Sequence, residues 1–273
     1  MLGTSRASQT QLRERVEALY EDPTQRPFLA DAGTGVLAVI DAADRERSLR
    51  DLWADTATVD TVKEGVLRQL FNDRISTLAQ QVVGGVITSR WSSPTDMMDA
   101  LEEAGASLLF AAAEADGRLD QVEEELFRFG RALDSSADLQ LALSDPATGP
   151  DVKVGIVENL LDGKSDPITE EILTHLAGHL RGRRMQMAVE QMSAMAAVRR
   201  DRLVAVVTSA VPLTDEQKSR LADALSRIQG KQVLINVVVD PSVVGGIQVR
   251  VGDEVIDGTL ANRLEQARRR LTS

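Results

Sequence analysis

Hydrophobic residues recur at helical spacing from residue 8 to about residue 201, and runs of β-branched residues are few in this part of the chain. Because side chains three or four positions apart share one side of a helix, the pattern predicts an all-helical region. Pro23 and Pro27 follow the first helix, and proline cannot continue its hydrogen-bond ladder. The expected helices span residues 9–20, 28–44, 46–54, 60–71, 75–90, 94–114, 119–133, 137–143, 150–161, 168–180 and 185–201.

Part of this helical region repeats. When the chain is displaced by 90 residues (139 − 49), residues 49–70 align with residues 139–160. Several matching positions are polar or glycine, so shared amphipathic character alone does not explain them, and a duplication is favoured over chance. The identical pairs are Asp55 and Asp145, Ala57 and Ala147, Thr58 and Thr148, Val62 and Val152, Lys63 and Lys153, Gly65 and Gly155, Leu70 and Leu160, and Met97 and Met187.

A single long helical pattern, residues 94–114, separates the two copies of the repeat. Its apolar and small residues extend far enough around the helix to serve two cores, so we expect it to end one bundle and begin the next. No flexible linker intervenes. The pattern predicts two related six-helix-type bundles that share this helix, with an additional N-terminal bundle at residues 1–96 and a second bundle at residues 97–202.

The hydrophobic period changes from 3.6 to 2 after Arg202. Thr214 to Gln217 form a capping-box start for one helix, and a leucine stripe predicts a last helix at residues 260–271. The fold class is therefore mostly α, with a small C-terminal α/β module of β-α-β-β-α order at residues 203–273. Its strands are expected at residues 203–209, 231–240, 247–251 and 254–257.

Composition excludes several classes of function. The 273 residues carry 31 Lys and Arg against 42 Asp and Glu, and the net charge of −11 disfavours binding to nucleic-acid phosphates. The chain has no Cys, which removes disulfides, thiolate nucleophiles and Cys-ligated zinc. No apolar run approaches the ~20 residues of a membrane span. Any contact with a membrane is expected to be indirect, through a partner.

Candidate catalytic and metal-binding patterns are sparse. Glu171, His175 and His179 could share one side of a helix, but the zincin motif needs a Glu directly after its first His. A groove or surface position is favoured for both histidines, and no metal is expected. Arg181 and Arg183 are interpreted as helix-end charges or as one side of a protein interface.

Gly245 and Gly246 follow a strand and invite comparison with a phosphate-binding loop. No helix is predicted directly after them, and the chain contains no dinucleotide-binding or P-loop pattern. A turn that positions the following strand is therefore preferred. The alternative function is an adaptor or sensor with a small-ligand site around these glycines in the C-terminal α/β domain.

The run VVVDPSVVGGIQVRVG, at residues 237–252, resembles the signature of the delta subunit of bacterial F-type ATP synthase. This family includes the mitochondrial oligomycin-sensitivity-conferring protein. The flanking runs VVTSAVPL and DEVIDGTL are also similar to the family. The resemblance covers about residues 97–273, and the N-terminal part looks like the added bundle of long actinobacterial delta chains. The signature positions are Asp240, Pro241, Gly245, Gly246 and Gly252.

The resemblance implies a non-catalytic stator subunit without cofactors, peripheral on the cytoplasmic face of the cell membrane. Such a subunit joins the catalytic hexamer to the peripheral stalk and resists rotor torque. The implied partners are the N-terminal helix of an alpha subunit, held by the first and fifth helices of the bundle, and b-type stalk subunits, which meet the α/β module. Carried onto this chain, the lining of the helix groove is Met97, Met98, Leu101, Leu108, Ile172 and Leu176.

Overall fold

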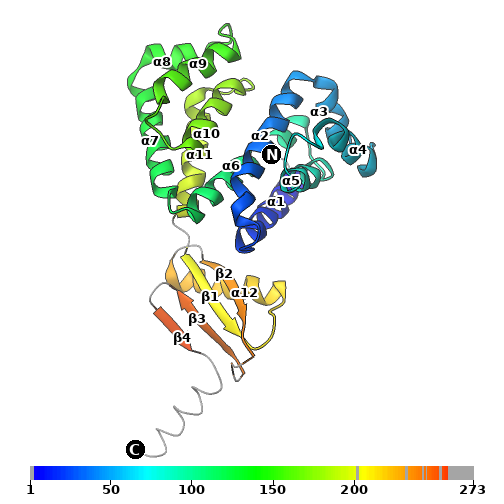
Figure 1. The fold of residues 1–273 in the computed structure, drawn as a ribbon, viewed down its shortest axis with the longest axis vertical. Coiled ribbons are helices and arrows are strands. Elements are labelled where there is room, and N and C mark those ends of the chain that lie inside the picture. The colour runs from blue at the N-terminus through cyan, green and yellow to red at the C-terminus, as the bar shows by residue number, and fades with distance from the viewer. Residues whose placement is uncertain are drawn as a thin grey trace, which may run out of the picture. The chain divides into compact units, whose positions relative to one another are not determined.

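The chain divides into two compact units in a computed structural model, one at Met1–Ala197 and the other at Val198–Ser273. The structure describes residues 3–200, 203–230, 233–241, 243, 245–251 and 254–257. The first unit is helical and the second contains a small mixed sheet, which confirms the predicted fold class at this level (Figure 1).

Helices make up the first unit, as the hydrophobic spacing predicts. Two ends differ clearly from the prediction, because the first helix begins at Gly3 and the fifth is shortened to Thr77–Ile87. The elements are α1 Gly3–Glu21, the 3-10 helix η1 Arg26–Phe28, α2 Leu29–Arg45, α3 Arg47–Ala54, α4 Asp60–Phe71, α5 Thr77–Ile87, α6 Pro94–Ala115, α7 Leu119–Ser135, α8 Ala137–Ser144, α9 Pro150–Leu161, α10 Pro167–Gly178 and α11 Met185–Arg200.

The sequence repeat corresponds to a repeat of helices. Elements α2, α3 and α4 recur as α7, α8 and α9 with both ends displaced by 90 residues (119 − 29, 137 − 47 and 150 − 60). The turn before α4 recurs as well, since the Asp55 carboxylate accepts from the Ala57 amide and the Asp145 carboxylate from the Ala147 amide. We call α1 to α5 the first copy and α7 to α11 the second copy. The recurrence supports a duplication.

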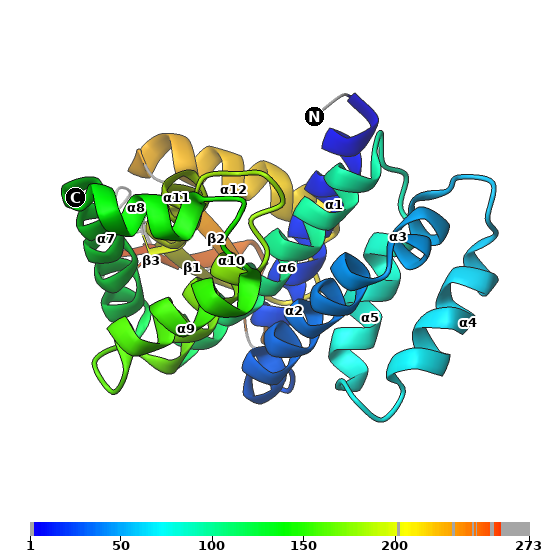
Figure 2. The ribbon, with the colours of Figure 1, turned by 90° about the horizontal axis from the view of Figure 1, so that it is seen from above.

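Helix α6 packs against helices of both copies (Figure 2). Two adjacent carboxylates on it point to different copies. Glu103 accepts hydrogen bonds from Gln9 and Arg13 on α1, whereas Glu102 binds arginines that follow α10. One continuous apolar core and one compact unit include both copies. The predicted division at residue 96 therefore does not separate two compact units, and it stays a prediction.

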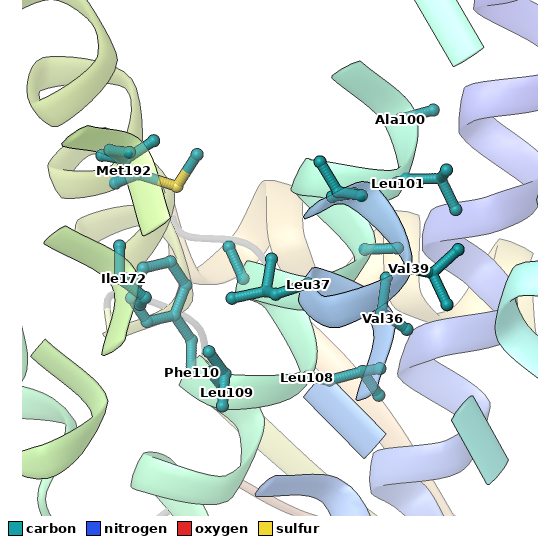
Figure 3. Packing of buried hydrophobic residues seen from close by; sticks show 14 of the residues in the cluster. Val36, Leu37, Val39, Ala100, Leu101, Leu108, Leu109, Phe110, Ile172 and Met192 are labelled. Atoms are coloured by element: carbon teal, nitrogen blue, oxygen red, sulfur yellow. The ribbon is translucent and has the colours of Figure 1, made fainter. Parts of the chain in front are cut away.

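Helices α2 and α6 approach each other closely where each carries a glycine. A β-carbon on Gly33 would lie 2.7 Å from Cγ of Leu109 and 3.0 Å from the carbonyl oxygen of Gly105. A β-carbon on Gly105 would lie 2.7 Å from Cδ2 of Leu37. In Figure 3, Leu37 leaves α2 toward the side where Phe110 lies. The glycines therefore let the two backbones pack at a distance that a larger residue prevents.

The second unit contains a four-stranded sheet in the order β2-β1-β3-β4. Strand β1 is parallel to β2 and antiparallel to β3, and β3 is antiparallel to β4. Helix α12 connects β1 to β2 and begins with the predicted Thr214–Gln217 capping box. The predicted last helix and Gly252 lie outside the described residues. The elements are β1 Leu203–Ser209, α12 Asp215–Gln229, β2 Val233–Val239, β3 Ile247–Val251 and β4 Glu254–Asp257.

Candidate docking groove and its charge cluster

The six residues predicted to line a helix groove lie in the core of the first unit. Four are on α6 and two on α10, and none is more than 2% exposed. They therefore do not line an open groove in this structure, because other helices of the chain cover them. Contact with a partner helix stays a prediction, and it requires that cover to move. The six residues are Met97, Met98, Leu101, Leu108, Ile172 and Leu176.

Helix α2 of the first copy provides much of this cover. It packs along α6 through the Gly33 and Gly105 contact. It also contacts α10 at two places. The side chain of Thr34 hydrogen-bonds Glu171, and the Asp44 carboxylate lies 3.0 Å from Nδ1 of His179, which directly follows α10. Helix α2 thus lies where an amphipathic partner helix was expected.

A buried charge cluster closes one end of this contact. Arg183 donates two hydrogen bonds of 2.8 Å to the two carboxylate oxygens of Glu102, and Arg181 donates to the same carboxylate. The Nη1 atom of Arg181 also lies 3.5 Å from Oδ2 of Asp44 on α2, and its Nη2 atom lies 3.3 Å from Oδ1 of Asp99. Two-pronged pairs of arginine with carboxylate are strong and directional. The cluster therefore joins α2, α6 and the turn after α10.

The turn after α10 places both arginines on Glu102. Arg181 adopts a φ of 47°, which is uncommon for a residue with a side chain, and Gly182 follows with a φ of 83°. This sharp reversal brings two guanidinium groups to one carboxylate. Arg183 also donates to the carbonyls of His179 and Leu180 at the C-terminal end of α10, as a helix-end charge does. The main partners of both arginines are carboxylates of the chain itself, and a role in a protein interface stays a prediction.

The charges in the cluster shift the pKa values of its carboxyl groups. Burial by itself raises the pKa of Glu102, but the hydrogen bond from Arg183 and the charge of Arg181 outweigh it and hold the pKa below its usual value. The pKa of Asp44 is also lowered, because the hydrogen bond with His179 and the charge of Arg181 overcome burial. Both carboxylates are therefore ionised at neutral pH.

His175 and His179 lie inside this region rather than on a free surface. Their rings stack with centroids 4.5 Å apart, and the His175 side chain is only 8% exposed. Glu171, the third member of the candidate metal set, pairs with Thr34 on α2. Among the described residues, no group of three or more side chains is arranged to hold a metal ion. The groove or surface position expected for both histidines does not hold for His175, which α10 turns toward Glu102, whereas His179 lines a surface cavity of about 760 Å³.

We expect His175 to make the stability of the first unit depend on pH. Burial lowers its pKa to about 3, so the unfolded chain, with an ordinary pKa of 6.5, binds a proton first as the pH falls. The stabilisation is present above pH 6.5 and is lost toward pH 3. The free energy of unfolding should fall by about 2 kcal/mol between pH 7 and pH 5, a range above the ordinary pKa values of Asp and Glu.

Urea titrations at several pH values test this expectation, with the fluorescence of the buried Trp53 and Trp91 as the signal. His175→Gln should flatten the dependence between pH 7 and pH 5. Leu176→Ala should destabilise the unit by creating a cavity but keep the slope. An equal slope in wild type and in His175→Gln would show that His175 takes up its proton in the folded state.

Four of the five signature residues, Asp240, Pro241, Gly245 and Gly246, lie in a turn between β2 and β3. The Asp240 amide donates to the carbonyl of Ser209 at 2.9 Å, which holds the end of β2 on β1. Gly245 and Gly246 have φ values of 64° and 84°, so the turn requires glycine at both positions. Pro241 lies in the same turn, between Asp240 and Val243.

A surface cavity of about 500 Å³ in the second unit lies on α12, beside Asp223, Ser226 and Arg227. These lining residues do not include Gly245 or Gly246. The alternative of a small-ligand site around the two glycines gains no support from this cavity. Within the described residues, no helix combines the length and the apolar character needed to cross a bilayer.

Comparison with known proteins identifies relatives along the whole chain. The family model described as ATP synthase delta (OSCP) subunit matches residues 101–271. ATP synthase subunit delta of Streptomyces avermitilis is 43% identical over 272 residues, covering 99% of this chain and 98% of the relative. The protein of the same description from Nocardia farcinica is 38% identical over 271 residues, covering 99% and 100%.

One solved structure overlaps the chain in part. A chain of the Toxoplasma gondii mitochondrial ATP synthase hexamer is 23% identical and covers 63% of this chain and 98% of its own length. The TM-score is 0.30, which is too low to show a common fold. The relationship therefore rests on sequence, which matches the first copy as well as the second.

Proposed function

Because the chain belongs to the ATP synthase delta (OSCP) family, we propose that it links the catalytic alpha and beta hexamer to the peripheral stalk and holds it against rotor torque. The observation that carries this proposal is the match to delta subunits over 99% of the chain. The subunit is non-catalytic. Its contribution to ATP synthesis is mechanical, because a link that yields under torque lets the hexamer turn with the rotor.

The helical unit suits a link that must resist torque. Its two copies share α6, and the adjacent carboxylates of Glu102 and Glu103 attach this helix to both of them. A continuous apolar core leaves no hinge segment between the copies. Close-packed interiors have low compressibility, so such a unit transmits force with little deformation.

The proposed partner of the helical unit is the N-terminal helix of an alpha subunit. Amphipathic helices dock where apolar ridges of two helices leave a groove, and α6 and α10 provide such ridges. Because α2 covers these residues, we propose that α2 shifts during assembly and that the partner helix replaces part of its contacts. The α/β module at residues 203–273 is the proposed contact for b-type stalk subunits.

The proposed location is the cytoplasmic face of the cell membrane, reached through these partners. Residues 1–96 are proposed to extend the rigid part of the link. They cover the second copy through α2, so their removal exposes apolar residues of α6 and α10.

The proposal is tested with membranes that contain the ATP synthase but lack this chain. We expect proton-driven ATP synthesis to fall to background and to return when the purified full-length chain is added. ATP hydrolysis by the catalytic hexamer should remain, because the catalytic sites are elsewhere. Synthesis at the normal rate without the chain would contradict the proposed role.

A further inference from the structure

One exposed apolar surface occurs at equivalent places in both copies. Residues three and four positions apart on α4 form a surface that we call the α4 face, and the corresponding residues of α9 form the α9 face. On α4 the residues are Val62, Gly65, Val66, Gln69 and Leu70. On α9 they are Val152, Gly155, Ile156, Asn159 and Leu160.

The larger side chains of the two faces are exposed to similar degrees. Leu70 is 43% exposed and Leu160 is 44%, while Val62 and Val152 are 46% and 58% exposed. All four lie outside the buried core. Exposed apolar side chains that share one helix surface mark sites of interaction more often than scattered ones do.

Other solvent-facing positions of α4 differ between the copies. Asp60 corresponds to Pro150 and Thr61 to Asp151. Arg68 corresponds to Glu158, which reverses the charge. All five positions of the face, in contrast, keep the same residue or the same chemical type. The apolar character of the face is thus retained where neighbouring surface positions have changed.

Neither packing against the described residues nor backbone conformation requires glycine at Gly65 or Gly155. Glycine inside a helix costs roughly 0.5–1 kcal/mol relative to alanine. A β-carbon on Gly65 or Gly155 would have no heavy atom of the described chain within 4 Å, and neither glycine has a positive φ. Neither packing nor backbone conformation explains the glycine, but close approach of another backbone from outside does.

We propose that the α9 face is a docking site for an amphipathic helix of another ATP synthase subunit, with Lys or Arg beside its apolar stripe. The stripe from Val152 to Leu160 is about 12 Å long at 1.5 Å per residue, which is two turns of a docked helix. Asp151 and Glu158 lie along one edge of the stripe and form no ion pair with another residue that the structure describes, although Asp151 lines the same surface cavity as Arg45 and Arg50. Basic residues on the docked helix complement these carboxylates.

The α4 face selects against the same helix. It offers similar apolar residues, with Val66 in place of Ile156, but Arg68 replaces Glu158 and Thr61 replaces Asp151. A helix with basic flanks therefore meets a cation and a neutral residue there in place of two anions. The two faces are alike in apolar character and differ in the charge beside it, so we expect each copy to discriminate between partner helices.

This site is separate from the groove of α6 and α10, because its residues lie on α9 and three of them, Val152, Asn159 and Leu160, are already exposed. The inference takes its partner from the proposed function. We test it by measuring the affinity of the full-length chain for ATP synthase membranes that lack it, in a co-sedimentation titration. Wild-type binding tests the proposed function, and the variants test the α9 face.

We expect Val152→Glu and Gly155→Ala each to lower the affinity at least tenfold. Gly155→Ala should not lower the melting temperature, because its new methyl group enters open space. The matched control is Leu141→Glu on α8, which replaces an apolar residue outside the face that is 68% exposed, against 58% for Val152, and should bind like wild type. Wild-type affinity in both α9 variants overturns the inference and leaves the proposed function intact.

A crosslinking experiment identifies the class of partner. Because the chain has no Cys, Asn159→Cys introduces a unique attachment point for a photo-crosslinker at the centre of the face. We expect the crosslinked peptide to come from a segment with apolar residues at helical spacing and adjacent Lys or Arg. Crosslinks to lipid, or to a segment without basic residues, overturn the assignment.

Discussion

Replacing Glu102 with leucine should lower the free energy of unfolding of the helical unit by about 3–5 kcal/mol. Glu102 is 2% exposed, and it is the shared partner of Arg181 and Arg183, whose side chains are only 12% and 23% exposed. The substitution leaves two guanidinium groups in a region with little access to water. Urea unfolding followed by tryptophan fluorescence measures the loss.

Glu103→Leu is the matched control on the same helix. Its partner Arg13 is 64% exposed and remains hydrated after the change, so we expect a loss of about 1 kcal/mol. Replacing Glu102, Arg181 and Arg183 together with apolar residues should recover part of the stability, because the two arginines are then no longer left without Glu102. Asp44 keeps Arg50 and His179 as partners, and Asp99, which loses Arg181, is 33% exposed. A loss below 1 kcal/mol for Glu102→Leu would show that the arginines find other partners.

The second large effect is expected for Gly33→Val at the crossing of α2 and α6. The new β-carbon would lie 2.7 Å from Cγ of Leu109 and 3.0 Å from the carbonyl oxygen of Gly105, and backbone cannot rotate away. We expect α2 to be forced from α6 and the free energy of unfolding to fall by about 3 kcal/mol. Gly84→Val on α5 is the control, because no heavy atom lies within 4 Å of its position.

The same variant bears on the proposed groove. If α2 must shift before the alpha-subunit helix binds, displacing α2 costs free energy, and a weakened contact between α2 and α6 lowers that cost. Gly33→Val should therefore bind the helix peptide more tightly than wild type. Calorimetric titration of the full-length chain measures this. Weaker binding by Gly33→Val, with the fold retained, would place the peptide on a surface that includes α2.

Most helices and strands could be predicted because each has a regular spacing of hydrophobic residues and is bounded by residues that end a helix or strand. The bounds of α4, α9, β1, β3 and β4 agree with the prediction. The two largest errors have different causes, one tertiary and one local. Helix α1 extends to Gly3, where the Ser5 and Ser8 hydroxyls bond Asp96 and the carbonyl of Arg90. Helix α5 ends early because the Thr88 and Ser89 hydroxyls bond the preceding turn.

The candidate site could be predicted only in part. Hydrophobic spacing shows that Ile172 and the apolar residues of α6 are covered, but it does not show whether the cover is a partner or the chain itself. The run of small and apolar residues in α2 was the available signal, because a helix that is apolar on several sides is buried on several sides. Glu102 and Arg183 are 81 positions apart, and no local pattern links them.

The shared helix α6 also sets how far one copy is rotated relative to the other about the helix axis. Each added residue lengthens an α helix by 1.5 Å and turns everything beyond it by about 100°. An insertion within α6, between its contacts with the two copies, would rotate one copy about the axis of α6. The helices of that copy would then lose their packing contacts in the common core. Insertions in the surface loops have no such effect. The length of α6 is therefore constrained in whole turns, while the loops can vary freely.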